Sequence, residues 1–381
     1  MYIVSVVLDV PLAQTFDYWL NNVPDSIIGR RVSVPFGRAN RCQVGIVLAV
    51  RVWEEAMPPA LKPVAEIFTD MPALSETSLA LWQFVAQYYF VPLGQVMALA
   101  LPAPLRQATP FTLTPPRIER WCLSATGQVA LLALRPAKHP RTDAFIAWCL
   151  AQTSWSEREA RTQFSRAKHY LTAWQTAHYL QPYIAPAQPQ PSLNAAQQAA
   201  VSAVESCFGQ FKTFLLHGIT GSGKTAVYFK WVASLQARGQ QVLILVPEIA
   251  LTPQLEARFR AALPAASLAV LHSGIPETAR TRAWLMAQAG TVDVVLGTRL
   301  AVFTPLPRLG LIIVDEEHDA SYKQESSPRY HGRDLAVLRA HLEGCAVVLG
   351  SATPSLESIH NAQTGKYALA RLTERADGQQ L

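Results

Sequence analysis

The sequence predicts a multidomain fold: a small mainly-β amino-terminal domain, a helical winged-helix-like domain, and an α/β lobe with a parallel sheet. Three observations support this prediction. The 381 residues exceed what one ordinary hydrophobic core accommodates. Proline-rich stretches interrupt the chain near residues 101–116 and 181–192. Beyond the second stretch, apolar runs alternate with helical segments. We place the domains at residues 1–105, 110–182 and 193–381.

Composition narrows the class of protein. Half of the residues are hydrophobic and 16% are charged, which is typical of globular chains. The sequence has no run of eighteen apolar residues and no basic opening, so we expect neither a transmembrane helix nor a secretory signal. Its five cysteines are scattered without a Cys-x-x-Cys pair. This argues against a disulfide framework or a complete zinc site and favours a reducing cytoplasm.

The first segment reads as short strands followed by a helix. The runs "YIVSVVLDV", "RRVSVPFG" and "CQVGIVLAV" are rich in Val and Ile and are bounded by Pro and Gly, as strands are. A helix is expected in "SETSLALWQFVAQYYF", where Ser75 and Thr77 can cap its start.

The middle segment is basic and mostly helical. Residues 111–192 hold nine Lys and Arg against four Asp and Glu, which fits either a polyanion partner or a solvated surface. Ser156 and Glu159 form a capping-box pair. The apolar residues that follow share one helical face, with basic residues off it, which suits a helix-turn-helix or winged-helix module as well as an ordinary small bundle. The face holds Ala160, Phe164, Ala167, Leu171 and Trp174, and the basic residues are Arg158, Arg161 and Lys168.

Six apolar runs in the last segment predict a doubly wound parallel sheet. Near-continuous Val, Ile and Leu fit strands buried on both faces, and such sheets bind ligands beyond the carboxyl ends of their strands. Each run ends in a polar or glycine cluster at that edge. The runs are "TFLLHG", "QVLILVPE", "LAVLHS", "VDVVLGT", "LGLIIVDEEH" and "CAVVLGSATP".

A phosphate-binding loop follows the first of these runs. Its glycines let backbone N–H groups point at phosphate oxygens, and the positive end of the next helix faces the same anion. Lys224 supplies a charge for the β- and γ-phosphates, and the Thr225 hydroxyl can ligate Mg²⁺. The loop matches G-x-x-x-x-G-K-[ST] as Gly218, Ile219, Thr220, Gly221, Ser222, Gly223, Lys224 and Thr225.

Two acids end the run "LIIVDEEH". Asp315 is expected to hold Mg²⁺ and Glu316 to polarise the attacking water. The alternative is that these acids cap the next helix. Together with the phosphate loop they favour nucleotide hydrolysis, with Lys224, Asp315 and Glu316 as the catalytic residues.

These motifs resemble those of helicase superfamily 2. "DEEH" followed by "GSATPS" is similar to the superfamily's hydrolysis motifs. "PEIALTPQ", "HSG" and "GTRLAVF" are similar to the DNA-contacting motifs of one branch, the primosomal protein N′ (PriA) family of replication-restart helicases. The resemblance implies ATP and Mg²⁺ as cofactors, and it implies that Gln197, in "LNAAQQAAV", contacts the adenine.

The resemblance extends to a loop that links DNA contact to hydrolysis. "DASYKQESSPRYHGRDLA" is similar to the family's aromatic-rich loop, with Pro328 where the family usually has an aromatic residue. It implies that Tyr322 and Tyr330 stack on bases and that the cations bind phosphate. The residues implied in coupling are His318, Tyr322, Lys323, Arg329, Tyr330 and Arg333.

The amino-terminal segment is similar to the family's domain that captures the 3′ end of a nascent strand. A carboxylate accepts a hydrogen bond from a 3′-hydroxyl, an aromatic ring stacks on the last base, and a lysine meets the phosphate. Without the resemblance, Asp17 reads as a turn residue and Phe16 and Tyr18 as core aromatics. The implied pocket residues are Phe16, Asp17, Tyr18, Gly37 and Lys62.

The family resemblance implies an ATP-dependent 3′→5′ DNA helicase that recognises abandoned replication forks and initiates restart by primosome assembly. The implied partners are forked and single-stranded DNA, single-strand-binding protein, primosome proteins and the replicative helicase, in a cytoplasmic, nucleoid-associated setting without a membrane. The family's second lobe and zinc-binding cysteines are not found before Leu381, so the sequence predicts a truncated chain. Two alternatives stay open: a non-enzymatic fork-binding module, and another superfamily 2 DNA translocase.

Overall fold

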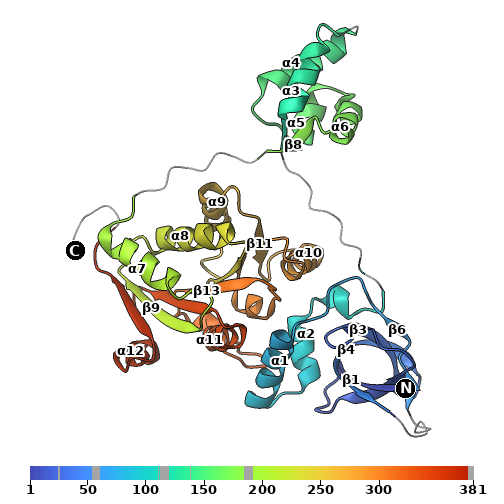
Figure 1. Ribbon diagram of the computed structural model, residues 1–381, viewed down its shortest axis with the longest axis vertical. Coiled ribbons are helices and arrows are strands. Elements are labelled where there is room, and N and C mark those ends of the chain that lie inside the picture. Colours follow the sequence, from blue (N-terminus) through green and yellow to red (C-terminus); the bar gives the residue numbers. More distant parts are fainter. Residues whose placement is uncertain are drawn as a thin grey trace. The chain divides into compact units, whose positions relative to one another are not determined.

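The computed structural model describes residues 1–24, 26–53, 61–109, 111, 120–137, 139–183 and 192–375. It comprises two compact units, shown in Figure 1. One unit joins Met1–Leu113 to Ala187–Leu381, and the other is Thr114–Pro186. Most of the predicted proline-rich linker at 181–192 lies outside the described residues.

A six-stranded sheet forms the amino-terminal part of the first unit. Its strand order is β5-β2-β1-β4-β3-β6. The three predicted strands are present, and the sheet also contains β2 (Phe16–Leu20), whose mixed pattern gave no strand signal in the sequence. The remaining strands are β1 (Tyr2–Leu8), β3 (Arg31–Phe36), β4 (Arg41–Val52), β5 (Lys62–Pro63) and β6 (Glu66–Ile67).

Two helices and a 3₁₀ turn follow this sheet. The predicted helix is α1 (Glu76–Tyr88), and Ser75 caps it by accepting a hydrogen bond from the backbone N–H of Ser78, as expected. Helix α2 (Leu93–Ala100) and the turn η1 (Ala103–Arg106) complete the segment.

The α/β lobe contains the predicted parallel sheet, with a seventh strand at its edge. The strand order is β11-β12-β10-β13-β14-β9-β15, and each neighbouring pair is parallel. The strands are β9 (Lys212–Gly218), β10 (Gln241–Leu245), β11 (Leu268–Leu271), β12 (Val294–Gly297), β13 (Leu309–Asp315), β14 (Ala346–Ser351) and β15 (Ala368–Leu372).

Helices cover both faces of this sheet. Alternate residues of each central strand point to opposite faces, so Ile313 packs with one layer and Ile312 with the other. The first layer holds α7 (Ala195–Glu205), α8 (Lys224–Ala237) and α9 (Pro253–Ala262). The second holds α10 (Glu277–Gln288), the turn η2 (Arg299–Phe303) and α11 (Gly332–Glu343). The chain also contains η3 (Ala320–Tyr322) and α12 (Leu356–Gln363).

The second helical layer shares its apolar core with the amino-terminal helices. Buried side chains of α1, α2, α10 and α11 belong to one hydrophobic cluster, and α1 lies beside α11 in Figure 1. Among the described residues, hydrogen bonds also cross this boundary. The Gln288 side chain donates to the Pro72 carbonyl at 2.8 Å, the Ala103 N–H donates to Glu277 at 3.1 Å, and the His331 N–H donates to the Tyr89 hydroxyl at 3.3 Å.

The second unit is a small helical domain with a two-stranded sheet. The antiparallel strands β7 (Trp121–Leu123) and β8 (Leu180–Pro182) bracket four helices around an aromatic core. This arrangement fits the winged-helix-like fold predicted for the segment. The helices are α3 (Ala125–Ala133), α4 (Pro140–Ala151), α5 (Glu157–Gln163) and α6 (Ala167–Thr176).

The basic stretch of this unit is two helices, not the single helix that its spacing suggested. Helix α5 ends where Phe164 takes an extended backbone conformation, and α6 begins at Ala167. The apolar spacing continues across the break because both helices pack on one core, which holds Ala160 and Leu171. The capping box of Ser156 and Glu159 is present, and Arg158, Arg161 and Lys168 are exposed.

Within the described ranges, the search for a helix able to span a membrane finds none.

Candidate nucleotide and DNA sites

The phosphate loop connects β9 to α8 at the carboxyl edge of the sheet. Gly223 immediately precedes the first helical residue. Its φ is +78°, a left-handed conformation that favours glycine. The next residue, Lys224, turns its ammonium back into the loop and donates to the Gly218 carbonyl at 3.2 Å. Ser222 is buried inside the loop, with only 1% of its surface exposed. The loop therefore has the curled backbone that the motif predicts.

Gln197 packs directly beneath this loop. Its side-chain amide donates to the Ser222 carbonyl at 2.8 Å, and its oxygen accepts from the Asn194 N–H in a capping box. Both ends of the carboxamide are thus engaged, and the residue is 3% exposed. The structure places Gln197 as a support of the phosphate loop, while its contact with adenine stays a prediction.

Asp315 ends β13 beside the phosphate loop. Its Oδ1 accepts a hydrogen bond from the Tyr228 hydroxyl at 2.7 Å, and its backbone carbonyl accepts one from Tyr322 at 2.6 Å. Burial raises the pKa of the Asp315 carboxyl. The alternative role as a helix cap does not hold for Asp315 or Glu316, because Asp319 caps the following turn.

Glu316 has an unusual backbone for an acid. Its φ is +46°, in the left-handed region that side-chain-bearing residues seldom adopt and that recurs at functional sites. This conformation turns its carboxylate toward the loop, where Oε1 lies 3.3 Å from the Lys224 ammonium. The predicted catalytic residues Lys224, Asp315 and Glu316 therefore converge at one sheet edge.

His318 connects these acids to the "GSATPS" segment. Its Nδ1 lies 2.7 Å from the Ser351 hydroxyl and its Nε2 lies 3.2 Å from the Thr353 hydroxyl. The same ring lies 3.7 Å from Glu316. His318 thus bridges the two motifs, which is consistent with its predicted coupling role.

Glu317 is a site residue that the sequence reading missed. It is fully buried and accepts hydrogen bonds from the Ser355 N–H at 2.7 Å and the Ser358 hydroxyl at 2.9 Å, both at the start of α12. Arg333 neutralises it at 3.0 Å. No separate signal in the sequence marked it, because its partners Ser355, Ser358 and Arg333 lie far from it along the chain.

The structure corrects the predicted roles of Tyr322 and Tyr330. Both rings are buried, with 0% and 1% of their surface exposed, so neither offers a face on which a base could stack. The Tyr322 hydroxyl also donates to the Leu245 carbonyl at 3.0 Å, and Tyr330 packs edge-on against Phe303. The aromatic pattern reflects core packing at these two positions.

The three cations predicted to bind phosphate differ in their accessibility. Lys323 and Arg329 are exposed. Arg333 is not available for DNA in this structure, because its guanidinium lies between Glu317 and Asp334 and also donates to the Ser355 hydroxyl. Its charge is matched internally, which corrects the prediction for Arg333.

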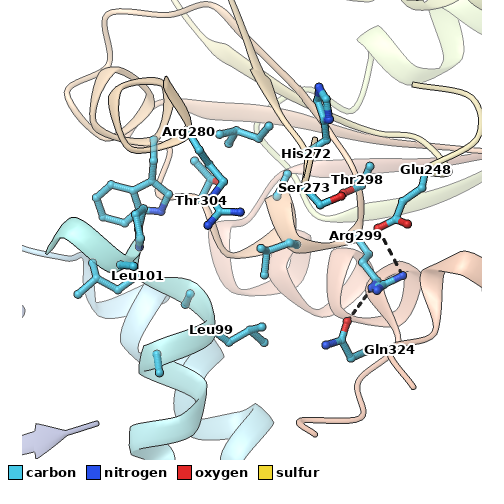
Figure 2. A pocket seen from close by; sticks show the side chains of 18 of the residues that line it. Leu99, Leu101, Glu248, His272, Ser273, Arg280, Thr298, Arg299, Thr304 and Gln324 are labelled. Carbon is cyan, nitrogen blue, oxygen red and sulfur yellow. Dashed lines mark hydrogen bonds and ion pairs between the residues drawn. The ribbon is translucent and has the colours of Figure 1, made fainter. Parts of the chain in front are cut away.

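Three further motifs meet in a pocket of about 260 Å³, shown in Figure 2. Glu248 of "PEIALTPQ", His272 of "HSG" and Arg299 of "GTRLAVF" come from the ends of neighbouring strands β10, β11 and β12. Arg299 donates to Gln324 at 2.7 Å and lies 3.7 Å from Glu248. Leu99 and Leu101 of the amino-terminal part line the opposite wall.

A second pocket, of about 620 Å³, lies on the amino-terminal sheet, and we call it the amino-terminal pocket. It unites the five predicted residues from three separate stretches of sequence, because β2 pairs with β5 and the end of β3 lies beside them. They are Phe16, Asp17, Tyr18, Gly37 and Lys62, and Pro35, Phe36, Arg38 and Asn40 complete the lining.

The polar groups of this pocket are held by neighbours. Asp17 accepts from the Ser5 hydroxyl at 2.6 Å and pairs with Arg51 at 2.6 Å, and Lys62 donates to the Gly37 carbonyl at 3.3 Å. Phe16 is half-buried against Phe36, whereas Tyr18 is a core residue with 4% of its surface exposed. Phe16 is therefore the better placed of the two predicted rings for stacking.

The comparisons with known proteins agree with this architecture. Residues 194–362 match the family model of the DEAD/DEAH box helicase, so the lobe and its site resemble a helicase domain of that class. Residues 5–102 match the 3′DNA-binding domain (3′BD) of PriA. The chain resembles the amino-terminal half of replication restart protein PriA.

The curated relatives quantify this similarity. The chain is 37% identical to replication restart protein PriA of Haemophilus influenzae over 99% of this chain and 52% of that protein. It is 33% identical to PriA of Chlamydia pneumoniae, over 98% and 51% respectively. PriA of Synechocystis is 52% identical over 45% of this chain and 20% of that protein. The chain thus spans about half the length of the first two relatives.

Proposed function

We propose that this chain provides the nucleotide-binding lobe and the 3′-end-binding domain of a 3′→5′ DNA helicase that acts in replication restart. The observation that carries the proposal is the convergence of Lys224, Asp315 and Glu316, with the Lys224 ammonium 3.3 Å from Glu316, in a chain similar to PriA proteins. The direction of movement and the recognition of forks rest on that similarity.

The residues at the sheet edge fit ATP and Mg²⁺. The loop offers backbone N–H groups and one lysine to phosphates, and Thr225 and Asp315 offer the oxygen ligands that Mg²⁺ prefers. When bound there, Mg²⁺ would neutralise charge on the phosphates. We expect Glu316 to orient a water, because its carboxylate lies 3.3 Å from the Lys224 ammonium at the phosphate loop.

Zinc has no comparable support in the structure. Among the described residues, no group of three or more His, Cys, Asp or Glu side chains is arranged to hold a metal ion.

The amino-terminal pocket fits the end of a DNA strand. Asp17 is an acceptor for a 3′-hydroxyl, half-buried Phe16 is a stacking surface, and Lys62 and Arg38 supply positive charge for a phosphate. An internal nucleotide lacks the free 3′-hydroxyl, so such a pocket favours strand ends.

Two binding measurements test the proposal on this chain. Calorimetry with ADP and Mg²⁺ should give saturable binding, and fluorescence anisotropy should show tighter binding of DNA with a 3′-hydroxyl than of the same strand with a 3′-phosphate. Absence of nucleotide binding would contradict the motor role. Equal affinity for the two DNA ends would contradict the pocket's role. Nucleotide binding without any DNA-stimulated hydrolysis would favour the non-enzymatic module.

The basic helices of the second unit supply a further proposed DNA contact. Arg158 and Lys168 are exposed, and Arg161 keeps half of its side chain accessible beside Glu157. Contact with duplex phosphates makes binding fall with salt, with a slope that scales with the number of neutralised phosphates. Neutralising all three residues should flatten that slope, and an unchanged slope would remove this contact.

A further inference from the structure

A tyrosine of the phosphate-loop helix reaches across the sheet edge to the metal-binding acid. Tyr228 lies one turn into α8, and its fully buried hydroxyl donates to Asp315 Oδ1 at 2.7 Å. A second tyrosine, Tyr322, fixes the backbone carbonyl of the same residue at 2.6 Å. Asp315 is therefore held through both its side chain and its main chain.

The neighbouring strand leaves room for this hydroxyl. Gly350 is the register partner of Asp315 on β14. A Cβ at Gly350 would lie 2.1 Å from the Tyr228 hydroxyl oxygen and 3.5 Å from Asp315 Oδ1. Real Cβ atoms essentially never approach another heavy atom as closely as 2.1 Å. Any larger residue at position 350 must therefore shift the Tyr228 hydroxyl or the strand beside it.

We infer that Tyr228 is a positioning residue for the metal site, and that the glycine opening "GSATPS" is required because it admits the Tyr228 hydroxyl. The hydroxyl donates to Oδ1 and thereby restricts the orientation of the Asp315 carboxylate. Hydrogen bonds to a metal-ligating carboxylate orient it, and their loss typically weakens metal affinity 10–100-fold. This inference rests on the proposed binding of ATP and Mg²⁺ at this site.

The direct test is Tyr228→Phe, which removes one oxygen and keeps the buried ring. The readout is the affinity of the full chain for fluorescent N-methylanthraniloyl ADP as Mg²⁺ is titrated. We expect a rise of about tenfold in the Mg²⁺ concentration at which half of the Mg²⁺-dependent gain in ADP affinity is reached. The affinity for the fluorescent ADP in EDTA should stay unchanged. Tyr170→Phe is the matched control, because it removes a tyrosine hydroxyl that hydrogen-bonds Thr142 at 2.7 Å in the other unit.

A second variant tests the geometric part. Gly350→Ala should shift the Mg²⁺ dependence in the same direction as Tyr228→Phe. In the Tyr228→Phe background, Gly350→Ala should raise the required Mg²⁺ concentration by less than about a further twofold. The reason is that two changes that act on one contact are not additive. Equal cost of Gly350→Ala in both backgrounds would overturn the link between the two residues.

The outcomes separate this inference from the proposed function. If the wild-type chain binds no nucleotide in the presence of Mg²⁺, the proposed function fails and the inference falls with it. If the wild type shows Mg²⁺-dependent binding and Tyr228→Phe shows the same dependence, only the positioning role is overturned.

Discussion

The nucleotide site and the amino-terminal pocket differ in how their charged groups are held. At the nucleotide site, Asp315 and Glu317 sit in buried networks of tyrosine, serine and arginine donors. In the amino-terminal pocket, Asp17 pairs with an arginine whose side chain is 56% exposed. A buried network fixes geometry strongly and is costly to break, whereas an exposed pair is screened by water and contributes little. The two sites should therefore respond very differently to loss of one acid.

The largest expected effect is the loss of stability when Glu317 is removed from its buried network. Glu317→Ala leaves Arg333 without its buried partner, and breaking such a pair costs about 3–5 kcal/mol of unfolding free energy. Asp17→Ala breaks a pair with exposed members and should cost less than about 1 kcal/mol. Chemical denaturation of both variants measures the two values. Similar losses would show that the contrast between the sites is wrong.

The next effect concerns nucleotide affinity. Lys224→Ala removes the only lysine that the phosphate loop carries, and we expect the affinity for ADP with Mg²⁺ to fall about 100-fold, the size of a lost charge-assisted hydrogen bond. Lys230→Ala is the control, because Lys230 is exposed on the same helix, α8. Calorimetry compares the two variants, and equal losses would argue against a phosphate at this loop.

A smaller effect is expected for DNA ends. Asp17→Ala should reduce the preference for a 3′-hydroxyl over a 3′-phosphate by about tenfold, the size of one hydrogen bond to a charged acceptor. Asp9→Ala breaks the ion pair with Arg106 outside the pocket lining and should leave the preference intact. Anisotropy titrations with matched strands measure both, and a preference that survives in Asp17→Ala would exclude this carboxylate from end recognition.

The smallest effect links pH to stability at Asp315. Burial raises the pKa of the Asp315 carboxyl in the folded protein, so ionisation of this group destabilises the fold. Its contribution to the free energy of unfolding is fully present below the unfolded pKa. That contribution is lost as pH rises through the folded pKa. Asp315→Asn should therefore raise the Tm of the nucleotide-free protein at pH 7. This gain in Tm should shrink as the pH is lowered from above the folded pKa of Asp315 to below its unfolded pKa. A variant that melts below the wild type at pH 7 would contradict this sign.

The two sites also differ in what the sequence could predict. The phosphate loop is a local pattern of eight residues with a backbone requirement, so the sequence alone located Lys224 and the Asp315–Glu316 pair, and the structure brings them together. The amino-terminal pocket joins β2, β3 and β5, which only tertiary pairing unites. Its residues followed from family resemblance and not from spacing.

The errors share one physical cause. Composition around Tyr322, Tyr330 and Arg333 predicts an aromatic and basic surface. The two tyrosine rings are instead packed in the core, and Arg333 forms an ion pair with buried Glu317. Residue type does not reveal which way a side chain points in an irregular loop. Tyr228 and Glu317 were missed for the converse reason, since a buried tyrosine or glutamate next to a motif gives no signal until its partner is known.

The continuous apolar cluster between α1, α2 and α11 has a practical consequence. A protein cut between residues 107 and 192 to isolate the lobe would leave the α11 side of that cluster facing water. Large exposed apolar patches drive self-association. The isolated lobe is therefore expected to precipitate or oligomerise unless the amino-terminal helices are supplied alongside it.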